Sequence, residues 1–233
     1  AKHFQQAQNR DNSHPDQAHV AHPRLGFYGV IDERFDTELI KQVAAARPEW
    51  QIVLVGPVVK IDPAHLPQAA NIHYMGQRTY QELPQFLAGW DVCLLPFAMN
   101  ESTKYISPTK VLEYMAAELP SVSTPITDVK VPYGDVVAIA DTPEKFIAAC
   151  ERMLNMSAEQ QAALKERGRI MRDMHDGLGS TLVGALSLLR SGRGTPAVMQ
   201  KHLQHALDAL KLSVDAMQDV GGDLGAVLGT LRY

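Results

Sequence analysis

Short apolar runs alternate with amphipathic segments over the first two thirds of the chain. Each run holds four to seven residues rich in strand formers, and the segments between them carry apolar residues at helical spacing. Strands that alternate with helices pair in parallel through right-handed crossovers, which predicts an α/β fold with a Rossmann-like, doubly wound parallel sheet. The predicted strands are LGFYGVI (25–31), QIVLVG (51–56), NIHYMG (71–76), DVCLLPF (91–97), SVST (121–124) and VVAIA (136–140), and the predicted helices are 36–47, 79–88, 108–118 and 143–154.

The pattern changes after Ser157, where strand-like runs stop and helical spacing takes over. One continuous helix is predicted from about residue 158 to residue 190, and it would couple the two parts of the chain rigidly. The stretch SGRGTP (191–196) ends that helix. Thr195 and Pro196 then supply an N-cap and a first helical position, so a second helix is expected to follow.

The second helix carries a heptad seam, which favours packing against other helices. Two helices alone make a poor core, so we expect this helical hairpin to dimerise as a four-helix bundle through residues 160–220, giving a homodimer. The predicted domains are therefore 1–157 and 158–233, with Gly221-Gly222 interrupting the second helix. The seam positions are Leu203, Leu207, Leu210, Val214 and Met217.

Composition and charge exclude several kinds of partner. Hydrophobic residues make up 45% of the chain, enough for a core, and the net charge is −4. Residues 1–155 hold 13 basic and 18 acidic side chains and the rest hold 9 and 8, so no basic surface for nucleic acid is expected. No apolar run approaches the roughly 18 residues of a membrane span. Cys93 and Cys150 lie in apolar or helical patterns and are expected as buried free thiols, which favours a cytoplasmic location.

The N-terminal segment AKHFQQAQNRDNSHPDQAHVAHP is polar and contains four histidines. Their spacing matches no zinc pattern, so we predict a solvated segment and no metal site.

Three loops of the predicted sheet suit a phosphate-bearing ligand. Strands that end in glycine and lead into helix N-termini present outward-pointing amides and a favourable dipole to an anion. The loops are Gly29 to Asp36, Gly56 to Lys60 and Ser107 to Lys110, and either Lys60 or Lys110 could supply a cation. No GxGxxG motif is present, so spacing alone leaves ligand binding and an ordinary scaffold role equally open.

The α/β part resembles the C-terminal half of a GT-B glycosyltransferase of the retaining, family-4-like type. The resemblance covers roughly residues 1–155, and the block that starts SPTKVLEYMA is its most specific piece. The blocks that carry it, in order, are GFYGVIDERFD, QIVLVGPV, NIHYMGQRTYQELPQFLAGWDVCLLPF and SPTKVLEYMAAELPSVST.

The resemblance implies a nucleotide-diphosphate sugar of the UDP type as ligand, with no other cofactor required. It implies that Glu113 contacts the nucleotide ribose and that the turn from Gly29 to Arg34 faces the sugar phosphate. The loop that holds Ser107, Thr109 and Lys110 would lie against the diphosphate.

Two departures from the family's pattern concern the donor site. Tyr105 stands where the family has its first Glu, and no Lys follows Arg34 five residues on. The N-terminal half that would hold the acceptor site is absent from this sequence, so the chain alone is not expected to transfer sugar.

His175 and Asp176 form a second candidate constellation, on the predicted long helix. An imidazole nitrogen can accept a phosphoryl group near neutral pH, and an adjacent carboxylate can hold its tautomer. Gly177 and Gly179 each cost up to about 1 kcal/mol of helix propensity against Ala, and they keep the surface open for an approaching domain. A His-Asp pair by itself is more often a solvated surface pair.

The surrounding sequence, roughly 160–233, resembles the dimerisation and phosphotransfer domain of sensor histidine kinases of the HisKA_3 type. The resemblance implies that His175 is the phosphorylated histidine and Asp176 its acidic neighbour. A kinase ATP-binding domain and a response regulator would then be partners in trans, since no ATP-binding domain follows Tyr233. Ser180 replaces a Gln used for phosphatase action, so that activity is not expected.

Three interpretations remain open at this point. The first is a fusion of a glycosyltransferase donor domain with a kinase phosphotransfer domain for two-component signalling. The alternative is a glycosyltransferase fragment whose helical tail serves only for oligomerisation. An artificial chimera joined near ERGR (166–169) is the third.

Overall fold

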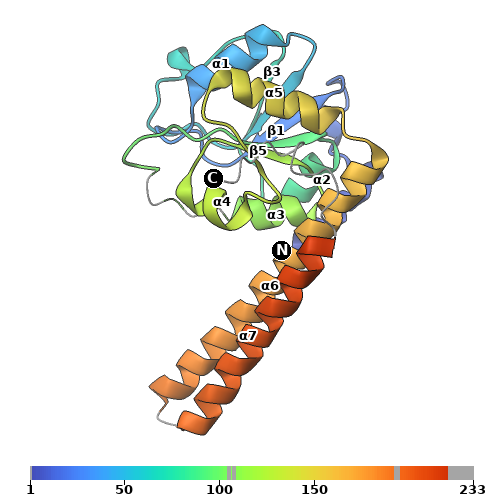
Figure 1. Ribbon diagram of the computed structural model, residues 1–233. Helices are drawn as coiled ribbons and strands as arrows, with labels where there is room; N and C mark the ends of the chain where they lie inside the picture. The colour runs from blue at the N-terminus through green and yellow to red at the C-terminus, as the bar shows by residue number, and fades with distance from the viewer. Residues whose placement is uncertain (1, 104–105, 107–108, 192–194, 220–233) are drawn as a thin grey trace.

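The computed structural model describes residues 2–103, 106, 109–191 and 195–219, and only the backbone for 209–219 (Figure 1). A six-stranded sheet has the order β3-β2-β1-β4-β5-β6, and all neighbouring strands are parallel. This confirms the predicted doubly wound sheet, whose order reverses between β1 and β4. The strands are β1 (Arg24–Tyr28), β2 (Gln51–Val55), β3 (Ile72–Gly76), β4 (Val92–Leu95), β5 (Ser121–Ser123) and β6 (Ala138–Ile139).

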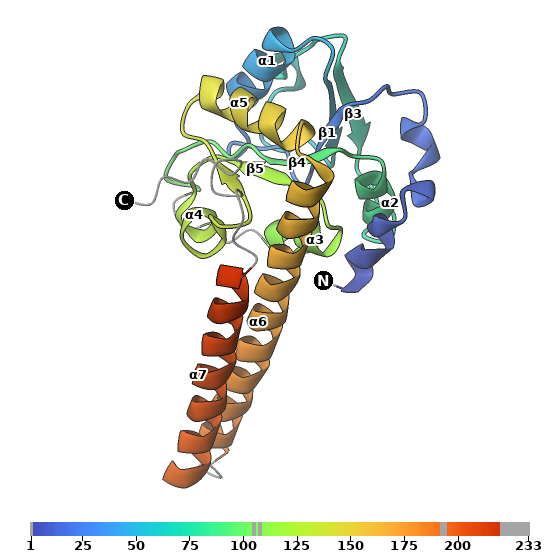
Figure 2. The ribbon, with the colours of Figure 1, turned by 45° about the vertical axis from the view of Figure 1, so that its right-hand side comes forward.

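Helices cover both faces of the sheet. In Figures 1 and 2, α1 and α5 lie together on one face and α2 and α3 lie on the other. Asp36 caps α1 by accepting from the Leu39 amide (2.9 Å), and Thr142 caps α5 in the same way. The helices of this part are α1 (Thr37–Ala46), α2 (Leu83–Ala88), α3 (Lys110–Ala116), α4 (Thr127–Tyr133) and α5 (Pro143–Leu154).

The central strands are buried on both sides, as parallel strands require. A Cβ atom added to Gly26 would lie 1.9 Å from the Trp90 ring, so glycine at this position lets Trp90 pack flat on β1. Trp90 is fully buried, and its indole Nε1 donates to the Gln17 side chain at 3.2 Å. Both cysteines are buried and free, as predicted.

Most residues of the N-terminal segment are exposed to solvent, but the segment also packs on the domain, which the prediction of a solvated segment did not anticipate. It forms three short 3₁₀ helices, η1 (Lys2–Gln8), η2 (Arg10–Asn12) and η3 (Pro15–Gln17), of which η1 contacts α2 and α3. Phe4 and Gln17 are fully buried, and Gln17 donates to the Phe86 carbonyl at 3.0 Å. The buried residues of this segment include apolar Phe4, Ala7 and Val20 and polar His14 and Gln17, so its polar composition did not indicate that it packs on the domain.

The chain ends in the predicted hairpin, formed by α6 (Ala158–Arg190) and α7 (Pro196–Asp219). Ser157 and Gln160 form a capping box at the start of α6. Figures 1 and 2 show both helices side by side, projecting away from the α/β domain. The predicted interruption at Gly221-Gly222 lies outside the described residues. In the described part, no helix is both long enough and apolar enough to cross a membrane.

The first half of α6 rests on α3, which fixes the hairpin to the domain. A Cβ atom added to Gly168 would lie 3.6 Å from Met115 Cγ, and Arg172 donates to the Met115 carbonyl. Lys165 Nζ lies 3.5 Å from Glu118 Oε2. Further along the chain, α6 leaves the domain and has α7 as its neighbour.

Candidate nucleotide-sugar site

Glycines shape the carboxyl edge of the sheet beside the reversal of strand order. Gly29 follows β1 with φ +141°, and Gly56 follows β2 with φ +143°, a backbone region that favours glycine. A Cβ atom on Gly56 would lie 1.9 Å from the Gly29 carbonyl oxygen, so the two turns approach each other closely. Open α/β sheets bind ligands at this position.

Lys110 is the first residue of α3, and its side chain lies against Gly29 in the turn after β1. A Cβ atom on Gly29 would lie 2.8 Å from Lys110 Cε, so the glycine makes room for this side chain. Lys110 Nζ lies 5.8 Å from the ring centroids of both Phe27 and Tyr28, within cation–π range. Burial lowers the pKa of Lys110, and the nearby Glu113 carboxylate partly opposes that shift. The result is a shielded cation at the edge of the sheet.

Glu113 lies one turn further along α3 and accepts a hydrogen bond from the Tyr28 hydroxyl. The Tyr28 ring is buried against Phe4 (5.8 Å between centroids) and Tyr114 (5.5 Å). Burial raises the pKa of Tyr28, as do Tyr114 and Glu113, so the phenol stays protonated and donates. Tyr28 was not among the predicted site residues, because in sequence it is one more aromatic residue of a strand.

Arg34 is engaged by a carboxylate in the turn after β1. Its Nη2 lies 2.5 Å from Asp32 Oδ2, and its Nε lies 3.0 Å from both Asp32 carboxylate oxygens. Asp32 is 4% exposed, and although burial raises the pKa of its carboxyl, the hydrogen bonds from Arg34 prevail and lower it. Asp32 was not among the predicted site residues, although an acidic residue two positions before Arg34 was a signal that could have indicated this pair.

The remaining predicted donor-site residues contribute less to this geometry. Lys60 lies at the same edge with φ +62°, but its side chain is exposed and its Nζ pairs with Glu33 Oε1 at 3.3 Å. Thr109 is the exposed N-cap residue of α3 and makes no capping hydrogen bond through its side chain. Ser107 and Tyr105 lie outside the described residues.

His175 and Asp176 lie in the middle of α6. His175 Nδ1 is 3.7 Å from Asp176 Oδ1, and the side chains are 52% and 73% exposed. The fold brings His175 close to the start of α3, because both line one hollow of about 470 Å³ between α3, α4 and α6. The other residues around this hollow are Thr109, Leu112, Thr127, Asp128, Val131, Pro132 and Tyr133.

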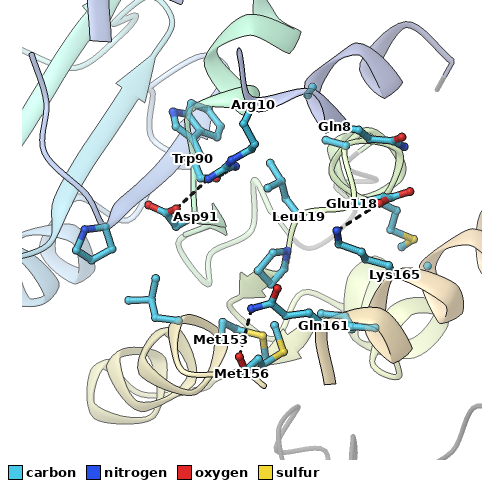
Figure 3. A pocket seen from close by; sticks show the side chains of 18 of the residues that line it. Gln8, Arg10, Trp90, Asp91, Glu118, Leu119, Met153, Met156, Gln161 and Lys165 are labelled. Carbon is cyan, nitrogen blue, oxygen red and sulfur yellow. Dashed lines mark hydrogen bonds and ion pairs between the residues drawn. The ribbon is translucent and has the colours of Figure 1, made fainter. Parts of the chain in front are cut away.

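A larger cavity of about 780 Å³ lies at the amino ends of the strands, opposite the glycine turns (Figure 3). Two ion pairs stand at its walls, Arg10 with Asp91 (2.9 Å) and Lys165 with Glu118 (3.5 Å). Gln161 crosses part of it and donates to the Met156 carbonyl at 3.2 Å. None of the predicted donor-site residues lines this cavity.

Comparisons with known proteins place the α/β domain in a family. The family described as Glycosyl transferases group 1 matches residues 22–156. A protein of Bacillus subtilis (strain 168), named as the teichuronic acid biosynthesis glycosyltransferase TuaH, is 28% identical over 142 residues. That match covers 58% of this chain, and the chain spans only 36% of that relative's length.

Solved structures show the same fold at low identity. The C-terminal domain of LpcC, a glycosyl transferase group 1 family protein of Francisella tularensis, has 15% identity and a TM-score of 0.53; the match covers 72% of this chain and 90% of that one. A sucrose-phosphate synthase from Thermosynechococcus elongatus has 16% identity and a TM-score of 0.51, over 79% and 51% of the chains.

These findings support the predicted C-terminal GT-B-like glycosyltransferase domain. None of them supports the predicted histidine kinase domain, and the family match ends before α6 begins. By the match over residues 22–156, the chain belongs to the glycosyl transferases group 1 family.

Proposed function

We propose that the α/β domain binds the nucleoside diphosphate of a UDP-type nucleotide sugar and serves as the donor half of a glycosyltransferase. The observation that carries this proposal is the shielded Lys110 cation packed on Gly29, with the Glu113 carboxylate one turn away. Both lie beside the reversal of strand order, where doubly wound sheets bind nucleotides.

Each group has a chemical task in this proposal. Lys110 offsets the charge of the diphosphate in a site of low dielectric, where the attraction exceeds that in water. Glu113 accepts hydrogen bonds from the ribose hydroxyls. Arg34, held by Asp32, faces the sugar phosphate. Sugar transfer needs an acceptor site as well, and we propose that a second domain supplies it.

Titration calorimetry with uridine, UMP and UDP tests the donor site. Affinity should rise with each phosphate, because Lys110 attracts the diphosphate and has nothing to attract in uridine. We expect a dissociation constant in the range of about 0.1–1 mM for UDP, near −5 kcal/mol. Absence of heat with UDP at millimolar concentration would contradict the proposal.

For the hairpin we propose a homodimer, in which the helices serve oligomerisation. Ala185 and Ala206 are buried where α6 meets α7, whereas five leucines nearby stay about half exposed. At 3.6 residues per turn, these leucines lie about 40–100° in the same sense from Ala185 and Ala206. In an antiparallel pair this rotation puts them on one side of the hairpin. They are Leu182, Leu186 and Leu189 on α6 and Leu203 and Leu207 on α7.

One continuous apolar face on each hairpin favours pairing of two copies face to face. The contact would be self-complementary, as a two-fold dimer requires, and would complete a four-helix arrangement. Within one chain, the heptad residues Leu203 and Leu207 do not fill the α6–α7 contact, so they remain available for a second copy.

A second candidate function is phosphoacceptance by His175. The observation that favours it is a half-exposed imidazole with a carboxylate 3.7 Å from its Nδ1. The test is a phosphotransfer assay in which a histidine kinase ATP-binding domain, ATP and a response regulator are supplied in trans. Phosphate should appear on the unaltered chain and not on His175→Gln; equal labelling of both would exclude His175 as the acceptor.

We propose a cytoplasmic location for the chain. Cys93 and Cys150 are both buried as free thiols, which fits a reducing compartment. Burial raises the pKa of each thiol well above its usual range, so neither is primed to react.

A further inference from the structure

The Glu113 carboxylate is held on one side only. Its Oε2 accepts from the Tyr28 hydroxyl, and no side chain in the described ranges donates to its Oε1. A carboxylate offers about four acceptor positions, so Oε1 is free to receive further hydroxyl groups. The strand that ends at Tyr28 therefore fixes which oxygen of Glu113 faces outward.

The donor of this hydrogen bond is itself immobile. Tyr28 is 6% exposed, and its ring lies between Phe4 (5.8 Å, stacked), Trp90 (6.5 Å) and Tyr114 (5.5 Å, edge-on). A ring packed on several sides has one accessible rotamer, so its hydroxyl stays in one place. Burial first, and then Tyr114 and Glu113, raise the pKa of Tyr28, so the hydroxyl carries its proton at neutral pH.

Lys110 lies one turn before Glu113 on α3, and its Nζ is 5.8 Å from the centroid of the Tyr28 ring. Side chains at this spacing on a helix can reach each other, and although burial lowers the pKa of Lys110, the Glu113 charge opposes that shift. Without the Tyr28 hydroxyl, Glu113 would turn toward this ammonium group. Such a pair would occupy both groups at once, the cation for the diphosphate and the acceptor for the ribose.

We infer that Tyr28 is a positioning residue that holds Glu113 away from Lys110 and aims its free oxygen at the ribose hydroxyls of the bound nucleotide. The inference rests on the proposed nucleotide site. It adds that recognition of the ribose depends on a residue from β1 that does not touch the nucleotide.

Two ligands and three variants of the full chain test this. UDP and 2′,3′-dideoxyuridine 5′-diphosphate differ only in the ribose hydroxyls. We expect Tyr28→Phe to weaken UDP binding about tenfold and to leave the dideoxy nucleotide unchanged, since only the former needs an aimed carboxylate. Glu113→Gln should behave in the same way. Tyr114→Phe is the matched control and should change neither, because the Tyr114 hydroxyl contacts the Leu94 carbonyl (3.5 Å) and not Glu113.

The outcomes separate the inference from the proposed function. If Tyr28→Phe weakens both nucleotides equally, or neither, the positioning role is wrong while UDP binding by the unaltered chain still stands. If the unaltered chain binds no UDP, the proposed nucleotide site is wrong, and so is the inference about Tyr28 that rests on it.

A second variant covers the case in which Tyr28→Phe does not fold. Phe4→Leu loosens the packing on Tyr28 without touching the hydrogen bond, and we expect about a threefold loss of the preference for UDP over the dideoxy nucleotide. An unchanged preference in a folded Phe4→Leu chain, together with an unchanged preference in Glu113→Gln, would overturn the inference.

Discussion

The α/β domain and the hairpin differ in how far their apolar side chains are exposed to solvent. Leu25, Ile52 and Leu94 in the sheet have no exposed surface, whereas Leu186, Leu189 and other leucines of the hairpin are about half exposed. A sheet covered by helices on both faces closes its own core, but two helices share only one contact. The first region is self-sufficient, whereas the second leaves apolar surface exposed, which the proposed dimer would bury.

The largest expected effect lies in the self-sufficient region. Trp90→Ala removes a fully buried ring and the partner of Gln17, and should lower the free energy of unfolding by about 3–5 kcal/mol. Leu186→Ala on the hairpin should cost less than about 1 kcal/mol in a monomer, because that side chain is 52% exposed. Urea unfolding followed by circular dichroism measures both. Similar losses would remove the contrast between the regions.

The next effect tests whether the hairpin has a partner. Leu186→Asp with Leu207→Asp would bury two charges in the proposed dimer and should raise its dissociation constant about a hundredfold or more. Light scattering over a concentration series measures it. Ser187→Asp is the control, because Ser187 is exposed and lies about 100° or more around α6 from each of its proposed interface leucines, so the dimer should stay intact. A monomer at every concentration for the unaltered chain would mean that the exposed leucines have no second copy to cover them.

A smaller effect concerns the charge buried at the donor site. Lys110→Met should weaken UDP binding about 10–30-fold at about pH 7, since the diphosphate loses its shielded cation. The same change at Lys60, exposed and paired with Glu33, should cost less than about threefold.

The pH dependence of that binding follows from the lowered pKa of Lys110. Burial brings it below the usual 10.5, so the ammonium begins to lose its proton at a lower pH than an exposed lysine. UDP affinity of the unaltered chain should therefore fall as the pH rises from about 7 toward 10. Calorimetry at several pH values measures this, and an equally steep fall in Lys110→Met would assign the effect to another group.

The smallest expected effect is that of replacing a glycine by alanine, which should change the free energy of unfolding in opposite directions in the two regions. A Cβ atom on Gly179 meets nothing within 4 Å, so Gly179→Ala should stabilise α6 by about 0.5–1 kcal/mol. The same substitution at Gly26 drives a methyl group into Trp90 and should destabilise the domain by about 1–3 kcal/mol. Thermal melts of both variants check the signs. Stabilisation by Gly26→Ala would contradict the described packing of Trp90.

Much of the fold was predictable because burial leaves a periodic pattern. Each predicted strand and the helices α1, α5 and α6 appear within a few residues of the expected bounds, since the apolar period differs between strand and helix. Helix α4 was missed, because ITDVKVPYG combines β-branched residues with Pro132 inside the helix. The packing of the N-terminal segment was also missed, because single buried residues such as Phe4 give no period.

The site was only partly predictable. Gly29 and Lys110 could be named from the glycine-containing loops that lead into helix N-termini, and Glu113 could be named because a family resemblance covered its motif. Tyr28 and Asp32 could not, because their roles depend on partners, Glu113 eighty-five residues away and Arg34 across a turn. A side chain's task depends on its neighbours in space, which spacing along the chain does not give.

The sequence by itself determined the succession of the six strands and most helices along the chain, the change to an all-helical pattern after Ser157 and the length of α6, because hydrophobic period, capping residues and glycines act locally. Only the tertiary structure decided that Lys110 lies over Gly29, that Tyr28 holds Glu113, and that His175 shares a hollow with the start of α3. It also decided that the hairpin leucines lie on one side and stay exposed. These facts depend on how separate elements pack, and packing is set by the shapes of surfaces that are distant in the chain.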